Sequence, residues 1–241
     1  MYNKLQIKRL YGFLALILQL KLFRLIMKKE KCILLFSGGR DSTVSAVYLA
    51  KQYEYLYLAT IQSAHLKGIE NVYLRLKELQ TFLQSKCTWN LYRKIENLPI
   101  KNLKTTTCLP CHAYYIALVQ NIAISNNIRN ISLGYVGYQK CWEEQSDYAK
   151  LSLRRYLDSV GLNLLLPVES VTEKEEMKQC LRELNLTEDA LEQKCLKSSF
   201  NIRLKETEME QQIDAWIDSI KSISNLISNN YNTTLIDNLV L

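Results

Sequence analysis

The segment KCILLFSGGRDST, residues 31–43, decides the fold of this chain. An apolar run at 32–36 leads directly into Ser-Gly-Gly-Arg-Asp-Ser-Thr, and a helical pattern follows at 44–50. This order predicts a strand, a glycine turn and the start of a helix. The two glycines let backbone N–H groups close around an anion, and the helix adds unpaired N–H groups and the positive end of its dipole. We therefore predict a phosphate or pyrophosphate site; the alternative is an ordinary turn with a Ser or Asp cap.

The loop is neither of two well-known glycine-rich nucleotide loops. A Walker A loop needs G-x-x-x-x-G-K followed by Ser or Thr, and a dinucleotide fold needs G-x-G-x-x-G. The pattern S-G-G-x-D-S instead resembles the signature of the PP-loop ATP pyrophosphatases. The resemblance implies that the loop holds the pyrophosphate end of ATP while a substrate oxygen is adenylated. It assigns ATP binding to Ser37, Gly38, Gly39, Arg40, Asp41, Ser42 and Thr43.

The side chains of the loop have distinct expected roles. Ser37 and Ser42 can donate their hydroxyls to phosphate oxygens, and Thr43 can join them. Asp41 would repel bare phosphate, so we expect it to coordinate Mg²⁺, directly or through water, or to fix the loop. Arg40 either faces solvent or neutralises phosphate charge. Asp41 and Ser42 are the predicted catalytic residues.

Composition limits the argument from charge. The 241-residue chain is long enough for one α/β domain with an appended helical piece. Its net charge is +7, but residues 1–26 hold five basic residues and no acid, which leaves +2 for the other 215 residues. Overall charge therefore gives no argument for nucleic acid binding. One local basic excess either contacts phosphate or is a solvated surface. It consists of Lys86, Arg93, Lys94, Lys101 and Lys104 against Glu96.

The cysteines and the N-terminal residues bear on the cellular setting. Seven cysteines with one C-x-x-C pair beside an ATP-type loop do not fit a secreted disulfide scaffold, so a reducing cytoplasm is expected. Residues 1–26 mimic a signal peptide, yet no small-x-small cleavage site follows. Met27 opens a natural start of the domain, so we interpret 1–26 as an N-terminal extension. The alternative is an amphipathic helix on a membrane surface; stable membrane association is not expected.

Strand and helix patterns alternate along the rest of the domain. Apolar or β-rich runs lie at 32–36, 55–61, 89–92, 131–133 and 164–166, with helical spacing at 42–52, 69–84, 113–125 and 148–160. The alternation predicts an α/β fold, a Rossmann-like parallel sheet of about five strands with helices on both faces. The PP-loop resemblance implies that this fold is of the adenine nucleotide alpha hydrolase-like type. Ligands bind such sheets at the carboxyl ends of the strands, where the phosphate loop falls. Thr60 and Ile61, after the second strand, lie where related folds hold adenine by backbone bonds.

The C-terminal part is predicted to be helical. Residues 172–175 fit a T-x-x-E capping box with Thr172 as the cap, and 187–195 is predicted as a shorter helix. Residues 206–227 form an amphipathic pattern that packs on the domain or, alternatively, makes a homodimer contact. We accordingly divide the chain into an extension (1–26), a PP-loop ATP-binding domain (27–200) and a C-terminal amphipathic helix with a tail (201–241).

The sequence TTTCLPCH carries a candidate metal site. Cys108 and Cys111 can bind one metal, but two thiols do not complete a tetrahedral site. Cys195 is the candidate third ligand, with His112 or Cys141 as a fourth unless that position stays open. The ligand types fit Zn²⁺ and a three-cysteine 4Fe-4S cluster equally. The alternative is a C-x-x-C pair that holds no metal.

The sequence GYVGYQKCWEEQS, residues 134–146, follows the fourth predicted strand and so faces the same sheet edge as the phosphate loop. Its mixture of side chains suits a flat ligand held by stacking, with a carboxylate reading N–H edges. The alternative is a loop–helix junction with a Glu-rich first turn. Gly137, Tyr138, Cys141 and Glu144 resemble the substrate loop of 7-cyano-7-deazaguanine synthase, a PP-loop enzyme of queuosine biosynthesis. That resemblance implies conversion of a small nucleobase-like acid to a nitrile, with ATP and ammonia.

The resemblance is mixed. The deazaguanine synthases carry a tight group of zinc-binding cysteines near the C-terminus, where this chain has only Cys195. The Cys108–Cys111 segment is instead similar to the T-T-C-x-x-C of the tRNA 2-thiocytidine synthetases, which carry an iron–sulfur cluster on three cysteines. Their later G-H-H-x-D-D run is replaced here by Gly-Tyr-Val. The sequence thus predicts an adenylating enzyme that forms AMP and pyrophosphate, most like the deazaguanine synthases. The alternatives are a tRNA-thiolating enzyme and a nucleotide-binding partner subunit without catalysis.

Overall fold

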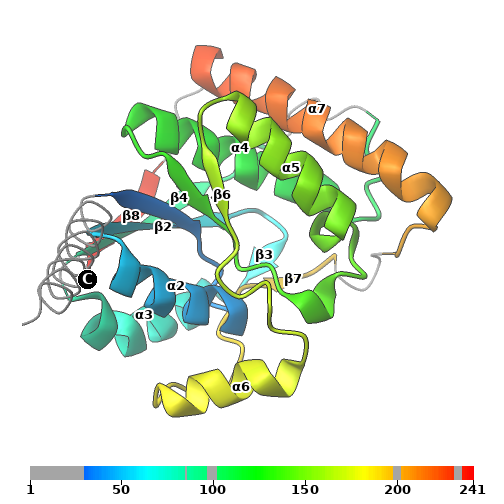
Figure 1. Ribbon diagram of the computed structural model, residues 1–241. Coiled ribbons are helices and arrows are strands. Elements are labelled where there is room, and N and C mark those ends of the chain that lie inside the picture. Colours follow the sequence, from blue (N-terminus) through cyan, green and yellow to red (C-terminus); the bar gives the residue numbers. More distant parts are fainter. Residues whose placement is uncertain (1–29, 85, 97–101, 198–201, 231–234) are drawn as a thin grey trace, which may run out of the picture.

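A mostly parallel six-stranded sheet forms the centre of the molecule (Figure 1). The structure, a computed structural model, describes residues 30–84, 86–96, 102–197, 202–230 and 235–241, so the predicted extension at 1–26 lies outside the described residues. The strand order is β6-β5-β1-β2-β4-β8, and only β8 runs antiparallel to its neighbour. The strands are β1 (Lys31–Leu35), β2 (Tyr55–Gln62), β4 (Cys87–Arg93), β5 (Asn130–Ser132), β6 (Asn163–Leu165) and β8 (Leu235–Val240).

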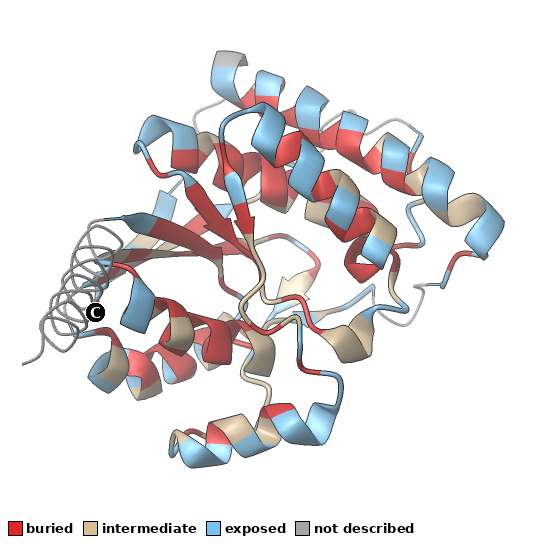
Figure 2. Ribbon diagram, viewed as in Figure 1, coloured by how far each residue is buried: buried red, intermediate tan, exposed pale blue. Residues whose placement is uncertain are grey.

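Helices cover both faces of the sheet, as the sequence predicts. One layer holds α2 (Arg40–Gln52), α3 (Ile69–Leu83) and α6 (Lys174–Glu183), and the other holds α4 (Leu109–Ser125), α5 (Asp147–Ser159) and α7 (Glu206–Asn230) (Figure 1). Successive residues of β1 serve the two resulting cores, because strand side chains alternate between faces. Ile33 belongs to the core beneath α4, whereas Cys32 and Leu34 belong to the core beneath α2 and α3. Figure 2 shows the buried residues gathered on the strands and the inner sides of the helices.

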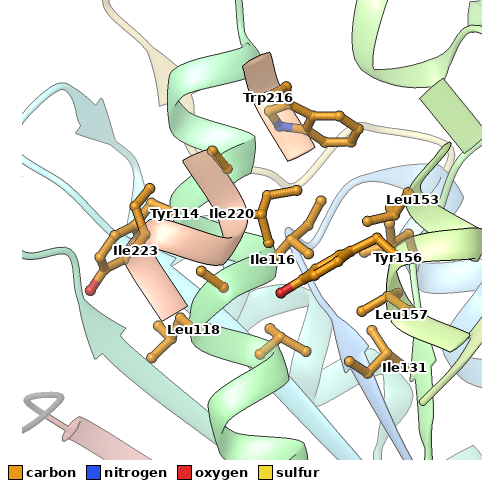
Figure 3. Packing of buried hydrophobic residues seen from close by; sticks show 14 of the residues in the cluster. Tyr114, Ile116, Leu118, Ile131, Leu153, Tyr156, Leu157, Trp216, Ile220 and Ile223 are labelled. Carbon is orange, nitrogen blue, oxygen red and sulfur yellow. The ribbon is translucent and has the colours of Figure 1, made fainter. Parts of the chain in front are cut away.

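The long C-terminal helix packs on its own domain. Trp216, Ile220 and Ile223 of α7 are buried at 1% exposure or less and meet Tyr114 and Ile116 of α4 in one cluster (Figure 3). Burial of large apolar side chains of this kind contributes about 1.5–3 kcal/mol each. The apolar face that 206–227 offered to a homodimer is therefore covered by α4 and α5 of the same chain. None of the described helices is long and apolar enough to cross a membrane.

One strand was not expected, and two local expectations are wrong. The tail contributes β8, a sixth strand whose Leu239 pairs with Trp89 at the sheet edge. Residues 187–195 are not helical, because their backbone is held by arginine side chains described below and ends in the two-residue strand β7 (Lys194–Cys195). The helix at 174–183 begins after Glu173 as N-cap, so Thr172 is not the cap.

The topology explains where a ligand can bind. The chain leaves β1 to build β2 and β4 on one side, then returns to place β5 on the other side of β1. The loops after β1 and β5 therefore diverge from neighbouring strands, which is the place where open parallel sheets form a crevice. The small antiparallel pair of β3 (Leu66–Lys67) and β7 adds a further wall from the C-terminal part.

Candidate functional site

The phosphate loop has the geometry that its glycines predict. Gly38 has a φ of +81°, and a Cβ there would lie 2.4 Å from the Leu191 carbonyl oxygen. Gly39 is the N-cap of α2 and, among the described residues, receives no side-chain cap. Its own N–H donates to Ser37 Oγ at 3.1 Å. The first turn of α2 is thus presented to the cavity without a capping side chain, as an anion site requires.

Hydroxyl groups of the loop's own side chains stabilise its backbone by hydrogen bonds. The Ser37 and Ser42 Oγ atoms lie 3.1 Å apart, and Ser42 Oγ also donates to the Gly39 carbonyl at 3.2 Å. Thr43 Oγ1 donates to the same carbonyl at 2.6 Å. Thr43 is fully buried and does not line the cavity, whereas Ser37 and Ser42 do. The hydroxyls available to a phosphate are therefore those of the two serines.

Asp41 is held in place by a tyrosine from the loop after β5. The Tyr138 hydroxyl donates to Asp41 Oδ1 at 2.6 Å. Burial raises the pKa of Asp41, while the Tyr138 hydrogen bond and the charges of Arg40 and Lys174 act in the opposite direction. Arg40 itself donates through Nε to the Glu188 carbonyl at 2.5 Å. Asp41 lines the cavity, where one carboxylate oxygen remains for a cation.

A second carboxylate lies over the phosphate loop. A Cβ built on Gly39 would lie 2.2 Å from Glu192 Oε2, so this side chain rests directly on the loop backbone. Burial raises the pKa of Glu192, and the neighbouring Asp41 charge raises it further. Two carboxylates this close repel each other and any phosphate, so a bound nucleotide needs a cation between them or a displaced Glu192.

The segment 187–195, here called the strap, is held over the phosphate loop by a buried arginine that no sequence motif indicated. Arg75 of α3 is 0% exposed and donates to the carbonyls of Thr187 at 3.1 Å and Asp189 at 2.5 Å. Its Nε also donates to the Gly38 carbonyl at 3.4 Å, and Glu78 neutralises its charge at 2.6 Å. One side chain thus joins the strap to the phosphate loop.

The predicted adenine position is built from the end of β2. Thr60 Oγ1 donates to the Phe36 carbonyl at 2.6 Å and accepts from Trp89 Nε1 at 2.8 Å, which fixes the strand end. The Ile61 carbonyl accepts a 3.1 Å hydrogen bond from Gln193 Nε2. The Gln193 Oε1 atom is buried and has no hydrogen-bond partner among the described residues. Thr60, Ile61 and Gln193 all line the cavity.

One cavity of about 490 Å³ joins these parts to the cysteines. Cys108 and Cys111, at the start of α4, line it together with Cys195 on β7, as the sequence predicts for a shared site. His65 adds a group that no motif indicated. Its Nε2 lies 3.5 Å from Cys111 Sγ, its Nδ1 lies 3.0 Å from Ser63 Oγ, and its backbone carbonyl accepts from Leu196 N at 2.9 Å.

The metal prediction has mixed support. Three thiols facing one cavity are the right type of donor for zinc or an iron–sulfur cluster. Within the described ranges, however, no three His, Cys, Asp or Glu side chains are gathered closely enough to hold a metal ion. No disulfide joins any of the seven cysteines, all of which are described. Burial raises the pKa of Cys111, and the nearby Lys94 opposes this.

The loop after β5 contributes less of the cavity wall than expected. Of its four candidate substrate residues, only Glu144 lines the cavity. Gly137 lies in a 3₁₀ turn (Gly137–Gln139) bonded to Val171, and Tyr138 is directed at Asp41. Cys141 is exposed and lies outside the cavity, which supports neither a substrate role nor a role as fourth metal ligand.

The far end of the cavity holds a polar cluster. His112 Nδ1 lies 3.1 Å from the Tyr135 hydroxyl, and the two rings stack with their centroids 6.1 Å apart. Burial lowers the pKa of His112, and the Glu144 carboxylate opposes this. Burial likewise raises the pKa of Tyr135, with Glu144 adding to the effect. Gly134, at the entry to this loop, packs so closely on Ser42 that a Cβ there would lie 2.9 Å from the Ser42 nitrogen.

No protein-family model matches the sequence, and no curated protein matches it. Solved structures do match the fold. One is the crystal structure of a 4-thiouridine synthetase in complex with RNA and bound ATP, with a TM-score of 0.56 and 15% identity over 86% of this chain and 55% of that chain. Another is the U34-tRNA thiolase NcsA from Methanococcus maripaludis with its 4Fe-4S cluster, with a TM-score of 0.50 and 13% identity over 85% of this chain and 74% of that one.

These likenesses concern the fold. The chain spans about half the length of the 4-thiouridine synthetase that it matches. Identities of 13% and 15% are too low to carry over an activity, but the match extends over most of this chain. The Rossmann-like α/β architecture predicted from the strand–SGGRDS–helix segment is therefore confirmed, both by the sheet itself and by its similarity to solved proteins of this kind.

Proposed function

We propose that this chain is an ATP-dependent enzyme of the PP-loop type that activates a carbonyl oxygen of a nucleobase in tRNA and replaces it with sulfur. The observation that carries the proposal is the convergence of the phosphate loop and the three cysteines on one cavity. The two solved proteins of similar fold support it, since one is a thiouridine synthetase with RNA and ATP and the other a tRNA thiolase with a 4Fe-4S cluster.

The ATP half of the reaction follows from the loop. The triphosphate lies against the N-terminus of α2, where Ser37 and Ser42 donate to phosphate oxygens. Asp41 would hold a Mg²⁺ ion, which would offset the repulsion between carboxylate and phosphate. The nucleobase oxygen attacks the α-phosphorus, and pyrophosphate leaves with its new charge stabilised by the loop N–H groups and Mg²⁺. A hydrosulfide-level sulfur donor then adds to the activated carbon, and the oxygen departs on AMP.

The cysteine half depends on Cys108, Cys111 and Cys195. Three thiolates are the donor set of a 4Fe-4S cluster, with Zn²⁺ as the second candidate. They would have to draw together to bind either, because no three such side chains are gathered at one point in the described residues. When bound, the cluster supplies a soft metal that favours sulfur ligands. The three thiols line the same cavity as the phosphate loop, which supports a reaction in which sulfur and activated base meet there. His65 orients Cys111 through its contact with Sγ.

The deazaguanine-synthase reading has weaker support. It rests on Gly137, Tyr138, Cys141 and Glu144, of which only Glu144 lines the cavity. A small nucleobase-like acid therefore remains the second candidate substrate, with ammonia as the nitrogen donor. A partner subunit that binds ATP without catalysis is the third candidate.

Pyrophosphate release separates the three candidates. The full chain, purified without oxygen, is incubated with ATP, Mg²⁺ and sulfide, and with either unmodified tRNA or 7-carboxy-7-deazaguanine. We expect release that depends on tRNA, together with sulfur incorporated into the RNA. Release that depends on the deazaguanine acid would support the second candidate instead. Tight ATP binding without release on either substrate would support the third.

A further inference from the structure

Glu144 is a buried carboxylate with an unused acceptor. Its side chain is only 5% exposed, and it lines the cavity. Its Oε2 atom has no hydrogen-bond partner in the part of the chain that the structure describes. A buried carboxylate oxygen without a donor costs free energy, because it has lost water and gained nothing in return. Glu143 Oε2 is also buried without a partner, but among these two carboxylates only that of Glu144 lines the cavity, where a water, an ion or a ligand can supply the missing donor.

The neighbours of Glu144 hold it in place. Gln145 accepts from Val136 N at 3.0 Å and donates to Gln139 Oε1 at 2.5 Å, which closes the loop on itself. Glu143 accepts from Leu204 N and so ties the same 3₁₀ turn (Glu143–Gln145) to the segment before α7. These bonds tie the turn on both sides of Glu144 to neighbouring segments.

A hydrogen-bond donor lines the same cavity as Glu144. His112 shares a 3.1 Å hydrogen bond between its Nδ1 and the Tyr135 hydroxyl. A phenol is a stronger acid than a neutral imidazole N–H, so Tyr135 donates and the ring proton lies on Nε2. Glu144 is near enough to act electrostatically on both His112 and Tyr135. The end of the cavity therefore combines one carboxylate acceptor with one imidazole N–H donor.

We propose that Glu144 and His112 recognise the lactam edge of a uracil-type base, with Glu144 accepting the ring N–H and His112 donating to an adjacent carbonyl. This rests on the proposed function, and it names the class of base that the site takes. Uracil presents N3–H between two carbonyls, whereas cytosine has no ring N–H beside its carbonyl and would turn the N3 lone pair towards the carboxylate. Tyr135 acts as a positioning residue, since it fixes the tautomer of His112.

The same contact serves the chemistry. When a uracil oxygen bonds to the α-phosphorus, its C=O π bond shifts into the ring and N3 gives up its proton. Glu144 takes that proton, so the adenylated base is neutral and pyrophosphate leaves with the electron pair of the broken P–O bond. A base methylated at N3 can neither donate to Glu144 nor lose a proton to it.

Binding of three RNA octamers to the full chain tests the proposal. The probes are oligouridylate, the same oligomer methylated at every N3, and oligocytidylate, each labelled at the 5′ end and followed by fluorescence anisotropy. Wild-type protein is expected to bind oligouridylate at least about tenfold more tightly than the other two, the size of one hydrogen bond to a charged group. Glu144→Gln should reduce this ratio to about two or less.

The readout is the affinity for oligouridylate divided by that for each of the other two octamers. The affinity itself is not used, because removing a negative charge strengthens binding of any RNA. Glu143→Gln is the control: it removes the adjacent buried charge but keeps an Oε1 acceptor for Leu204 N, and the residue lies outside the cavity, so it should keep the wild-type ratio. Equal binding of oligouridylate and its methylated form, no binding of oligouridylate, or an unchanged ratio in Glu144→Gln would each overturn the proposal.

Pyrophosphate release measured on the same proteins separates this proposal from the proposed function. Release with tRNA but no discrimination between the octamers would contradict the Glu144 assignment alone. Discrimination without any use of ATP would contradict the proposed function and leave the recognition of the base standing.

Discussion

The Tyr138 hydroxyl donates a 2.6 Å hydrogen bond to Asp41 Oδ1, and this bond joins the loop after β5 to the phosphate loop after β1. The two residues are 97 positions apart and meet because β5 and β1 are neighbours in the sheet. The bond fixes the carboxylate that we assign to Mg²⁺, so the loop after β5 helps to position the proposed ATP site.

Removing this bond should slow the reaction without abolishing it. Tyr138→Phe keeps the ring and loses a hydrogen bond to a charged group, which predicts about a tenfold lower rate of pyrophosphate release. Asp41→Asn should lower that rate by about a hundredfold or more, because the cation loses its ligand. Tyr148→Phe is the matched control, since its hydroxyl bonds Asp214 outside this cavity. A near-normal rate in Asp41→Asn would refute the role assigned to the loop.

The position of the strap over the phosphate loop should depend on Arg75. Arg75→Ala leaves the carbonyls of Thr187 and Asp189 without their donor and the Glu78 carboxylate without its partner, which predicts a loss of about 3 kcal/mol in the free energy of unfolding. Urea denaturation measures this. Limited proteolysis should also cut the mutant within 187–195. The exposed Arg182, which pairs with Glu175 and Glu188, is the control, and Arg182→Ala should have little effect.

The course of 187–195 also shows why sequence reasoning failed there. Thr-Glu-Asp followed by apolar residues is an ordinary helix start, and nothing local opposes it. The opposing contacts come from Arg75 on α3 and Arg40 on the phosphate loop, more than 110 positions away. Strand β8 was missed for a similar reason. Its sequence, LIDNLV, places Asp and Asn in its centre, and only pairing with β4 makes it a strand.

The parts that sequence did predict share a local cause. Strand β1 is a short apolar run, and α3 buries Val72, Leu76, Leu79 and Leu83 at helical spacing, so the α/β alternation is readable without tertiary information. The glycines at 38 and 39 indicate the loop in the sequence, because few other residues fit its backbone geometry. His65, Gln193 and Tyr135 carry no such signal; they reach the cavity only through the arrangement of the sheet.

Gln193 should influence the choice of nucleotide. Its Nε2 donates a hydrogen bond to the Ile61 carbonyl, while its buried Oε1 has no partner among the described residues. An adenine amino group at this strand end would donate to that oxygen, whereas the carbonyl of guanine would repel it. Gln193→Leu should weaken ATP binding by roughly three- to tenfold and should reduce the difference between the affinities for ATP and GTP. Calorimetric titration measures both. An unchanged ATP-to-GTP ratio would exclude contact between Gln193 and the base.

Stability should fall at alkaline pH. Burial raises the pKa of Tyr53 to about 12, with Cys32 and Glu30 adding to it, and burial with the Asp237 hydrogen bond raises the pKa of Tyr73 to about 12. Between about pH 10 and 12 the unfolded chain loses these protons while the folded chain keeps them, so the folded state is disfavoured as pH rises. Urea midpoints should decline between about pH 10 and 12. Tyr73→Phe should reduce that decline, and an equal decline in this variant would contradict the assignment.

The cysteines that line the cavity should account for bound iron. Protein purified without oxygen is expected to carry iron and sulfide, with the broad absorption of a 4Fe-4S cluster, because Cys108, Cys111 and Cys195 face one cavity. Each of the three Cys→Ser variants should lose most of that iron, while Cys141→Ser should retain it, since Cys141 is exposed and lies outside the cavity. Elemental analysis and absorption spectra distinguish the outcomes. One zinc per chain with no sulfide would favour a zinc site on the same thiols, and iron that persists in all three variants would place the metal elsewhere.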